Sequence, residues 1–481
     1  MAQMTVADVA AHAFLVDGKW MEDGEMLEVK APYDGAVVGR IFQGNRQHAE
    51  AAIGAAVKAF GTTRRLPAFE RQRVLRCVSE GIAKRKEEFA RTLCQEAGKP
   101  IKAARTEVER AIFTFTVAAE ESTRIYGEYL PLDWQEYTAG RWGIVRRFPL
   151  GPIAGITPFN FPLNLVAHKV APAIAAGCPM VLKPAPQTPL CSLLLAEVVQ
   201  QAGWPDGALN VLPLSNDDAS VLVADDRLKM ISFTGSTAVG WQIKKNSSKK
   251  KVILELGGNA GVIVHSDSDV EYAAERCVAG GFGYAGQTCI SVQRILVEHS
   301  VYGKFTDALL SGVKELKTGD PLDETTDVGP LIRESDAVRA TEWVQEAVRG
   351  GARLLCGGAR HGSIMEPTVL TGTKHDMKVN RQEIFAPVVS VEPYNDFNAA
   401  VREINHSAYG LQAGIFTRDA KLMFQAYEEL EVGGLVAGDV PSFRIDHMPY
   451  GGIKDSGLGR EGLRYAIEEM TEPKLMVMNL R

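Results

Sequence analysis

The chain has 481 residues, of which 46% are hydrophobic and 23% charged, and its net charge is −6. This length exceeds that of one ordinary hydrophobic core, so we expect two or three domains. The slightly acidic balance disfavours a broad surface for nucleic acid or anionic lipid, which leaves small molecules as the expected partners.

The N-terminal stretch MAQMTVADVAAHAFLVDG lacks the basic start and apolar core of a secretory signal, and the chain has no apolar run long enough to cross a bilayer. We therefore expect a cytoplasmic protein without membrane contact. Residues 45–122 interleave Ala, Arg and Glu with Ile, Val, Leu and Phe. This pattern predicts successive amphipathic helices, with AGKP at 97–100 as a stop between two of them.

The next stretch, IYGEYLPLDWQEYTAGRWGIVRRFPLG, alternates apolar or aromatic residues with polar ones around an Ala-Gly turn. The alternation predicts a long β-hairpin that stands away from the helical body. Arms of this kind commonly serve assembly, so the hairpin also favours an oligomer.

Short apolar runs then recur with helical stretches between them, first as PIAGIT, PMVLKP, ALNVLP, KMISFTG and KVILELGG. A second series consists of AGVIVH, SVQRILVE, ARLLCGG, APVVSVEPY and QAGIFT, with helices opening at Asp267, Val301 and Asp396. Strands that alternate with helices predict βαβ units and parallel sheets. The predicted fold class is therefore α/β, with two doubly wound parallel-sheet domains and ligands at the carboxyl ends of strands.

The stretch FTGSTAVG places Gly235 and Ser236 between a predicted strand and an amphipathic helix. Bare backbone N–H groups at a helix start attract a pyrophosphate. Because the spacing is G-x-x-x-x-G rather than G-x-G-x-x-G, an ordinary glycine turn with a serine cap stays equally open.

Two polar residues stand out beside apolar strands. Two prolines fix the backbone around Asn160 in GITPFNFPLNLVAHK, where a side-chain amide could donate to an oxyanion or simply bond to its own turn. Glu255 lies inside the apolar run of LELGGN. Burial would raise its pKa toward that of a general base, while the alternative is a carboxylate capped by neighbouring N–H groups.

The seven cysteines are spread thinly and odd in number, which fits reduced thiols better than a disulfide framework. Cys289 is distinctive because it follows small and polar residues in FGYAGQTCISVQ and precedes a β-like run. Its position alone does not make it a nucleophile, since cysteine is often buried as a small hydrophobe. The usual zinc spacings of cysteine and histidine are absent from the sequence, so we expect no required metal.

Taken in order, these segments resemble the aldehyde dehydrogenase superfamily along nearly the whole chain. The matching motifs are TPFNFP, LKPAPQTP, FTGS, LELGGN, GQTC, EIFAPV and PYGGIKDSGLGREG. The resemblance implies oxidation of an aldehyde to its acid, with Cys289 as nucleophile and Glu255 as general base. Asn160 and the backbone N–H of Cys289 would form the oxyanion hole. A retained base also implies water rather than coenzyme A as the acyl acceptor.

The resemblance further implies NAD or NADP as cofactor, with contacts from Ile156, Thr157, Pro158, Lys183, Gly235, Ser236, Leu256, Glu383 and Phe385. Lys183 and Glu383 suit ribose hydroxyls, and Phe385 offers a face to the nicotinamide. Pro186 departs from the pattern, because relatives that prefer NAD often carry a ribose-binding glutamate there. Its absence removes a repulsion against a 2′-phosphate, so both cofactors stay open.

The matching motifs say less about the substrate than about the cofactor. Arg110 and Arg444 lie in segments that line the substrate approach of relatives, and an arginine fork can clamp a carboxylate, phosphonate or sulfonate. The alternative for both is a structural salt bridge. We expect a small polar or anionic aldehyde, lactaldehyde-like or a semialdehyde. Lys169 and Glu472 resemble residues that the family uses for proton relay, with a surface salt bridge as the alternative.

By resemblance, the dinucleotide-binding domain comprises residues 1–123 and 142–254, and the catalytic domain residues 255–450. Residues 451–465 return to the cofactor domain, and residues 124–141 and 466–481 form an oligomerisation arm of a homodimer or homotetramer. Two alternatives remain: a catalytically silent relative kept for binding or structure, and a cysteine hydrolase without nicotinamide. A hydrolase would not need FTGS or EIFAPV, and no sequence motif indicates a histidine as the base for Cys289.

Overall fold

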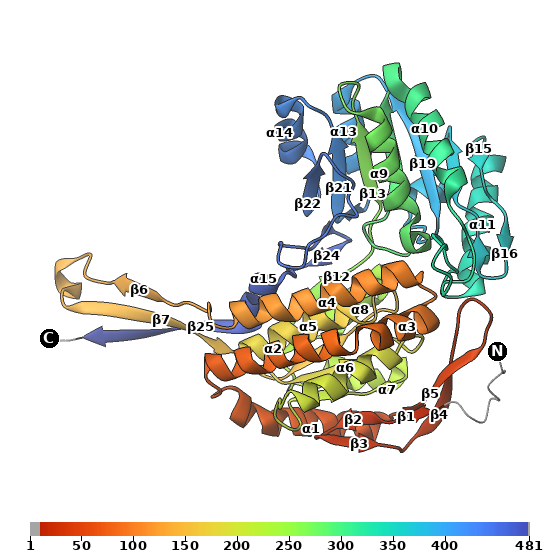
Figure 1. The fold of residues 1–481 in the computed structure, drawn as a ribbon. Helices are drawn as coiled ribbons and strands as arrows, with labels where there is room; N and C mark the ends of the chain where they lie inside the picture. The colour runs from red at the N-terminus through yellow and green to blue at the C-terminus, as the bar shows by residue number, and fades with distance from the viewer. Residues whose placement is uncertain (1–9, 480–481) are drawn as a thin grey trace.

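The computed structural model describes residues 10–479, which form two α/β lobes and a protruding arm (Figure 1). Residues 46–121 are almost entirely helical, as their amphipathic pattern predicts, in α1 (Arg46–Thr63), α2 (Ala68–Lys84), α3 (Lys86–Ala97) and α4 (Ile101–Glu121). Gly98 ends α3 in a left-handed conformation with φ of 65°. Glycine takes this conformation at low cost, which explains why AGKP stops the helix.

The first lobe is built on an eight-stranded sheet of order β24-β12-β11-β8-β9-β10-β2-β3. The bounds are β24 (Gly457–Leu458), β12 (Lys251–Glu255), β11 (Met230–Thr234), β8 (Ile153–Ile156), β9 (Met180–Lys183), β10 (Leu209–Val211), β2 (Phe14–Val16) and β3 (Lys19–Met21). The five strands from β12 to β10 are parallel. The chain winds from β8 outward to β10 and then returns to β11, so the switch point lies between β8 and β11. Ligands of doubly wound sheets bind at such a point.

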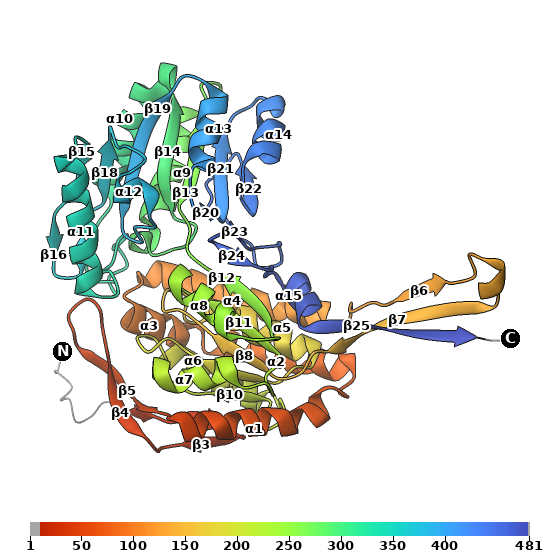
Figure 2. The ribbon, with the colours of Figure 1, turned by 180° about the vertical axis from the view of Figure 1, so that it is seen from behind.

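Helices cover both faces of this sheet, with α2 and α4 nearer the viewer in Figure 1 and α7 and α8 nearer in Figure 2. Besides α2 and α4, these helices are α5 (Asn164–Ala176), α6 (Leu190–Gln201), α7 (Asn216–Ala224) and α8 (Thr237–Asn246). Their apolar faces and the sheet share one core, in which Phe14, Phe89 and Phe115 are fully buried.

The second lobe holds a seven-stranded sheet of order β15-β18-β19-β14-β13-β21-β22, parallel except for β15. The bounds are β15 (Arg353–Cys356), β18 (Thr368–Thr371), β19 (Val388–Tyr394), β14 (Val292–Glu298), β13 (Ala260–Val264), β21 (Gln412–Phe416) and β22 (Gly434–Ala437). Its helices are α9 (Val270–Phe282), α10 (Tyr302–Glu315), α11 (Glu334–Arg349), α12 (Lys378–Arg381), α13 (Phe397–Asn405) and α14 (Ala420–Glu429). The predicted α/β class with two doubly wound parallel sheets is confirmed.

The arm is a three-stranded antiparallel sheet of order β25-β7-β6 that extends beyond the first lobe (Figure 1). The predicted hairpin supplies β6 (Glu128–Pro131) and β7 (Arg141–Pro149), and the C-terminal strand β25 (Thr471–Asn479) pairs with β7 along its whole length. The helix α15 (Leu463–Glu469) leads from the first lobe into β25.

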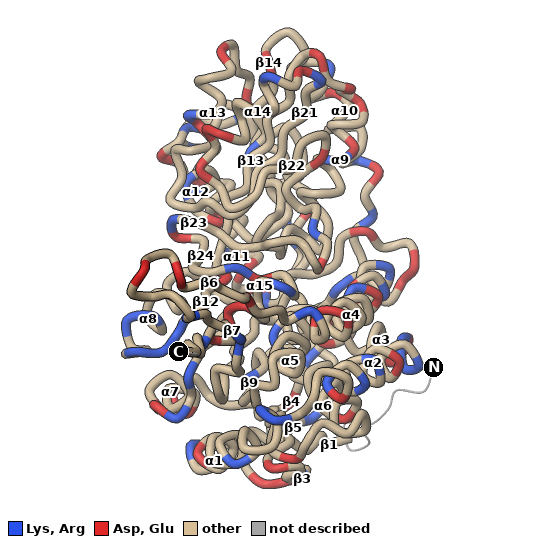
Figure 3. The backbone as a smooth tube through the Cα atoms, turned by 90° about the vertical axis from the view of Figure 1, so that its left-hand side faces the viewer, with Lys and Arg blue, Asp and Glu red and all other residues tan. Residues whose placement is uncertain are grey.

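Several short strands were not predicted. Near the N-terminus, β1 (Ala11–His12), β5 (Val37–Gln43) and β4 (Glu25–Lys30) form a separate sheet. Two small pairs, β16 (Arg360–His361) with β17 (Ile364–Met365) and β20 (Tyr409–Gly410) with β23 (Ile453–Lys454), close loops of the second lobe. In Figure 3 acidic and basic residues are interspersed over most elements of the view. No helix of the described part is long and apolar enough to span a bilayer.

Candidate active site

One cavity of roughly 530 Å³ collects side chains from both lobes. It lies where the carboxyl ends of β8 and β11 in the first sheet face the segments that precede β14 and β19 in the second. Apart from Lys169 and Glu472, every residue that the sequence singled out for catalysis, cofactor or substrate lines it: Arg110, Ile156, Thr157, Pro158, Asn160, Lys183, Gly235, Ser236, Glu255, Leu256, Cys289, Glu383, Phe385 and Arg444. Residues from distant parts of the chain, from Arg110 to Arg444, therefore line one cavity.

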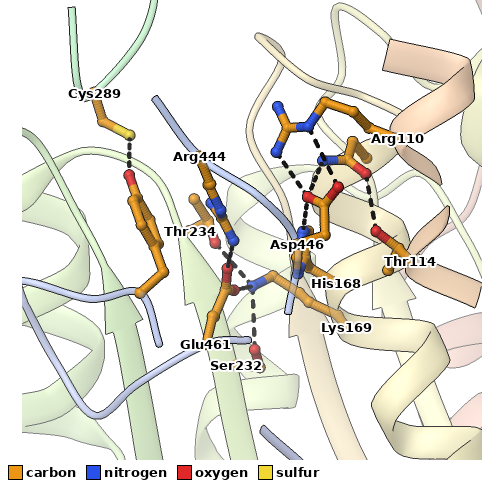
Figure 4. A network of polar contacts seen from close by, with 12 residues as sticks. Arg110, Thr114, His168, Lys169, Ser232, Thr234, Cys289, Arg444, Asp446 and Glu461 are labelled. Atoms are coloured by element: carbon orange, nitrogen blue, oxygen red, sulfur yellow. Dashed lines mark hydrogen bonds and ion pairs between the residues drawn. The ribbon is translucent and has the colours of Figure 1, made fainter. Parts of the chain in front are cut away.

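Cys289 is partly buried on the loop before β14, and its sulfur lies 3.0 Å from the Tyr450 hydroxyl (Figure 4). Burial raises the pKa of the Cys289 thiol to about 12, while the Tyr450 hydrogen bond acts in the opposite direction. Because burial also raises the pKa of Tyr450 well above its ordinary value, the phenol stays protonated and can donate to the thiolate.

The turn before Cys289 has an uncommon backbone. Tyr284, Ala285 and Gly286 have φ of 50°, 53° and 69°, so three successive residues are left-handed. The Tyr284 hydroxyl donates to the Ala97 carbonyl at 2.8 Å, which ties this turn to the first lobe. Conformations of this kind cost about 1–3 kcal/mol for a residue other than glycine, and they persist where the surroundings enforce them.

Gly286 and Gln287 support the turn in different ways. A Cβ at Gly286 would lie 2.2 Å from the Ala386 carbonyl oxygen, so only glycine allows this close approach. The Gln287 side chain is buried and does not line the cavity. Its amide instead bonds the backbone of Pro330 and Ile332 and fixes the loop.

Asn160 is buried, and its side-chain amide donates to the Gln287 carbonyl at 2.9 Å. The alternative, a bond to its own turn, is therefore wrong. The contact joins the first lobe to the residue two positions before Cys289. An amide NH₂ has a second N–H, which can donate to an oxygen formed next to the sulfur.

Glu255 ends β12 and is buried, and neither of its carboxylate oxygens has a hydrogen-bond partner among the described residues. The alternative of a carboxylate capped by N–H groups is therefore wrong. Burial, and next to it the charge of Glu461, raises the pKa of Glu255 well above its ordinary value. A carboxyl with a raised pKa suits general-base work near neutral pH.

Lys169 does not pair with Glu472, which is a correction to the sequence prediction. Glu472 lies exposed on the arm strand β25, opposite Phe148. Lys169 is fully buried and its ammonium bonds Glu461 at 3.0 Å, Thr234 at 2.8 Å and Ser232 at 3.1 Å (Figure 4). A buried ammonium needs such a carboxylate because an unpaired charge is costly there.

Glu461 pairs with two cations, because the Arg444 guanidinium also bonds it at 3.1 Å. Burial opposes its ionisation, but the charges of Lys169 and Arg444 prevail and lower the pKa of Glu461 to about 2. Two neighbouring glutamates are thus held in different states, with Glu461 ionised and Glu255 tending to stay protonated. Divergence of this kind marks acid–base assignments in active sites.

The cofactor side of the cavity presents donors without protein partners. Ser236 is the N-cap residue of α8, yet its side chain makes no capping bond, so the predicted serine cap is wrong. The Lys183 ammonium makes one long contact, 3.5 Å to the Pro184 carbonyl, and burial lowers the pKa of Lys183 to about 8. A free helix N-terminus and a buried ammonium both favour a bound phosphate.

Two glycines near α8 allow close approach. A Cβ at Gly240 would lie 2.3 Å from the Leu256 side chain, so this glycine lets α8 pack against the segment after β12. A Cβ at Gly257 would lie 2.5 Å from Glu383. The Glu383 carboxylate accepts from the Gly258 N–H at 2.9 Å, and burial raises the pKa of Glu383 to about 7.

Phe385 also lines the cavity. Its backbone has a φ of 50°, and its ring meets the Phe159 ring edge-on, with the centroids 6.0 Å apart. Two aromatic rings at the cavity wall offer an apolar surface for a planar ring.

Arg110 and Arg444 both line the cavity, and both form ion pairs. A place at the cavity and a structural salt bridge are therefore not exclusive for these two arginines. Arg110 bonds Asp446 at 2.7 Å, and Asp446 also bonds His168 at 2.8 Å and Asn164 at 3.3 Å. The Arg444 guanidinium lies 3.7 Å from the Tyr450 ring centroid. Arg444 Nε is buried with no hydrogen-bond partner among the described residues, and the Arg444 side chain lines the cavity.

Sequence reasoning missed Tyr450, Asp446 and Glu461. Tyr450 and Glu461 lie within the matched segment PYGGIKDSGLGREG, but the motif gives neither of them a role. A signal was present for Glu461, because a buried Lys169 after the asparagine turn requires a carboxylate from elsewhere in the chain. The sequence holds no comparable signal for the pairing of Tyr450 with Cys289.

Comparison with known proteins places the chain among aldehyde-oxidising enzymes. Residues 20–476 match the aldehyde dehydrogenase family. A 3-sulfolactaldehyde dehydrogenase from Priestia aryabhattai is 43% identical over 99% of this chain and 100% of that protein. The structure is similar to aldehyde dehydrogenase 21 from Physcomitrella patens in complex with the reaction product succinate, with a TM-score of 0.97, 46% identity and 98% of each chain covered. It is also similar to a glyceraldehyde-3-phosphate dehydrogenase from Methanocaldococcus jannaschii complexed with NADP, with a TM-score of 0.91, 39% identity, and 95% and 100% of the chains covered.

Proposed function

The chain belongs to the aldehyde dehydrogenase family, and from this premise we propose that it oxidises a short anionic aldehyde to the acid through Cys289, Asn160 and Glu255. As a member of the family it is an aldehyde-oxidising oxidoreductase that uses NAD or NADP. The single observation that carries the proposal is the shared cavity, which is lined by a cysteine, an asparagine amide and a buried carboxylate without a hydrogen-bond partner among the described residues.

In the first half-reaction, the Cys289 thiolate adds to the aldehyde carbon and the carbonyl π electrons move to oxygen. Asn160 and the backbone N–H of Cys289 hold the resulting alkoxide. The alkoxide reforms its C=O bond as the C–H bond breaks, and the hydride leaves with both electrons. The nicotinamide of NAD or NADP supplies the hydride acceptor when bound. Cys289 is left as a thioester.

In the second half-reaction, Glu255 takes a proton from water, and the hydroxide adds to the thioester carbon. The C–S bond then breaks, which releases the carboxylic acid and restores the Cys289 sulfur. Because only the ionised carboxylate can accept a proton, the hydrolysis rate rises with pH through the raised pKa of Glu255. The ionised Glu461 contributes to that rise in pKa, since a nearby negative charge disfavours a second one.

The cofactor proposal is supported by groups that lack protein partners. The open N-terminus of α8 would hold the pyrophosphate, and the Lys183 ammonium would hold the adenosine ribose or its 2′-phosphate. Glu383 would accept from a hydroxyl of the second ribose, beside Phe385. Gly235, Leu256 and residues 156–158 complete the wall.

The substrate proposal rests on the Arg444 guanidinium, which lines the cavity. A carboxylate or sulfonate at the far end of a short aldehyde would give this group a charge-assisted partner. Two relatives support this reading, because one is named for 3-sulfolactaldehyde and another was solved with succinate. Arg110 lies on the same wall and adds positive charge, although Asp446 already engages it.

The mechanism is tested by the first turnover. The parent protein, Glu255→Gln and Asn160→Ala are mixed with NADP⁺ or NAD⁺ and an aldehyde, and reduced nicotinamide is followed by absorbance. Glu255→Gln should give one equivalent of reduced cofactor and then slow by about 10²–10⁴-fold. Asn160→Ala should lose about 10²–10³-fold without a burst. Glu428→Gln, exposed on α14 in the second lobe, is the control and should behave like the parent.

Three outcomes would overturn this mechanism. An unchanged steady state in Glu255→Gln would exclude the base role. Nucleotide binding without turnover in a broad aldehyde panel would favour the catalytically silent relative. Ester hydrolysis without any dependence on dinucleotide would favour the cysteine hydrolase.

The substrate class is tested with matched aldehydes. Succinic semialdehyde and 3-sulfolactaldehyde are compared with butanal and lactaldehyde, which lack the anionic group, in the parent and in Arg444→Gln. Hydrogen bonds to charged groups contribute about 1.5–3 kcal/mol, so kcat/KM for the anionic pair should fall about 10–150-fold. The neutral pair should change far less. An equal loss for both pairs would reject anion recognition by Arg444.

A further inference from the structure

A second cluster of ligand-type side chains lies outside the cavity, in the second lobe. His375 belongs to the loop that leads into α12, and Glu403 and His406 lie at the C-terminal end of α13. One ligand atom of each residue falls within 4.8 Å of the other two. None of the three lines the active-site cavity.

The two imidazoles are stacked. Their centroids are 3.5 Å apart and their planes differ by 7°. His375 Nδ1 is closed to solvent, has no hydrogen-bond partner among the described residues, and lies 3.6 Å from a Glu403 carboxylate oxygen. A buried polar atom without a partner costs free energy. A cation bound to the ring nitrogen and the carboxylate would give this nitrogen a partner. For His406 to bind the same ion, its ring would turn out of the stack, because a bound ion lies in the plane of each imidazole that ligates it.

The end of α13 presents its ligands from a fixed backbone. Glu403 and His406 are three residues apart, a spacing that places both side chains on one helix face. The buried Arg294 guanidinium bonds the Glu403 carbonyl at 2.9 Å and the Ile404 carbonyl at 3.1 Å. The nearby Lys454 ammonium bonds the Asn405 carbonyl at 2.9 Å and pairs with Glu431. These two cations are thus engaged, and they anchor the helix end.

We propose that His375, Glu403 and His406 form a site for a divalent transition-metal ion, with zinc as the probe of choice. Two imidazole nitrogens and one carboxylate oxygen are ligands that zinc accepts, and water can complete its coordination. Imidazole donors favour zinc, copper or nickel over magnesium or calcium. The set does not stand out in the sequence because it combines one Glu-x-x-His step with a histidine 31 positions from His406.

The site joins α13 to the segment that carries two predicted cofactor contacts. Asn380 in α12 bonds Thr373 and the Lys374 carbonyl, which holds the His375 loop against α12. Glu383 and Phe385 follow directly after α12. A metal bridge from His375 to α13 would therefore reduce the motion of residues 372–385. The site is structural and takes no part in the proposed oxidation.

The test uses the metal-free full chain carrying Cys289→Ser, which removes the cavity thiol as a competing ligand. Zinc chloride is titrated by calorimetry into this protein and into versions with His375→Asn, Glu403→Gln or His406→Asn. We expect one equivalent in the parent and at least tenfold weaker binding in each site variant. His299→Asn, a histidine beside Glu298 on the same lobe, should bind like the parent.

Two further measurements separate ligation from a folding defect. Zinc should raise the melting temperature of the parent and of His299→Asn but not of the site variants, whose metal-free melting temperatures should match the parent. Hydrogen exchange of residues 372–385 should slow with zinc. Absence of zinc binding in the parent, or equal binding in His375→Asn and His406→Asn, would overturn the site. Unchanged hydrogen exchange of residues 372–385 would contradict the predicted metal bridge between His375 and α13.

Discussion

At the scale of single residues, identical side chains take opposite roles according to their partners. Glu255 and Glu461 are both buried, but of the two only Glu461 forms ion pairs, with Lys169 and Arg444. Ionisation in a buried place requires such partners. Glu461 can therefore carry charge permanently, whereas Glu255 is left free to gain and lose a proton.

Tyr450 offers a residue-scale prediction about the nucleophile. Its hydroxyl is 3.0 Å from the Cys289 sulfur and favours the thiolate. Tyr450→Phe removes this donor, so the pKa of Cys289 should rise further. Because a hydrogen bond to a charged group contributes about 1.5–3 kcal/mol, alkylation of Cys289 by iodoacetamide near neutral pH should slow about tenfold or more. The pH dependence of the alkylation rate, followed on the Cys289 peptide by mass spectrometry, checks this.

Tyr302→Phe is the matched control for that experiment. The Tyr302 hydroxyl bonds Thr371 at 2.7 Å in the second lobe, and this residue does not line the cavity. Its loss should leave the alkylation rate of Cys289 unchanged. An unaltered pH profile in Tyr450→Phe would mean that the hydroxyl does not act on the sulfur.

Pro186 carries a second residue-scale prediction, which concerns the choice between NAD and NADP. It lines the cavity near Lys183, and no carboxylate of the described residues forms an ion pair with Lys183. Pro186→Glu would introduce a charge that repels a 2′-phosphate and accepts from a 2′-hydroxyl. We expect KM for NADP⁺ to rise at least tenfold and KM for NAD⁺ to fall, as measured by steady-state kinetics with both cofactors.

Pro186→Gln separates the effect of charge from the loss of the proline ring. It should leave the ratio of the two KM values close to that of the parent. A similar change of the ratio in Pro186→Gln and Pro186→Glu would assign the effect to the backbone.

At the scale of elements, the turn before Cys289 shows how backbone conformation supports the site. Gly286 has a φ of 69° and faces the Ala386 carbonyl, whereas Gly283 has a φ of −54° and a Cβ there would meet no atom within 4 Å. Gly286→Ala must move either the carbonyl or the turn. It should lower the melting temperature, since a left-handed alanine alone costs about 1–2 kcal/mol, and it should reduce turnover by displacing Cys289.

Gly283→Ala provides the comparison within the same turn. Because the added methyl group meets open space, its melting temperature and turnover should stay near those of the parent. If Gly286→Ala behaved in the same way, the close approach to Ala386 would not constrain the turn.

Elements with strong periodicity could be predicted from the sequence, and short ones could not. The runs PIAGIT and KMISFTG gave clear strands because parallel strands buried on both faces are continuously apolar. The N-terminal strands β1 and β4 are short, mixed in polarity and defined by pairing with β5. Tertiary partners decide such segments, so local pattern carries little information about them.

The same division applies to the candidate site. Cys289, Glu255 and Asn160 could be identified because each lies in a short motif with a chemical meaning. The contact of Tyr450 with Cys289 spans 161 positions, and that of Glu461 with Lys169 spans 292. Long-range contacts of this kind depend on how the two lobes meet, which motif spacing does not describe. The assignment of Glu472 failed for this reason.

At the scale of the whole molecule, the arm is the part that the two lobes leave uncovered. Its strand β25 has one neighbour, β7, so its outer edge is unpaired among the described residues. Met476 and Val477 are 52% and 53% exposed on this strand, and Trp134 is 86% exposed at the end of the arm. A long edge strand with exposed apolar side chains favours pairing with another chain.

We therefore predict a homo-oligomer assembled through the arm. Light scattering after size exclusion should give the parent a mass that is a multiple of 52.2 kDa. Met476→Lys with Val477→Lys should shift the protein to a smaller species, because two ammonium groups at an apolar interface lose their hydration without gaining partners. Phe424→Lys is the control, since Phe424 is 67% exposed on α14 in the other lobe and its replacement should leave the mass unchanged. A parent that remains monomeric at every concentration would show that the arm serves another purpose.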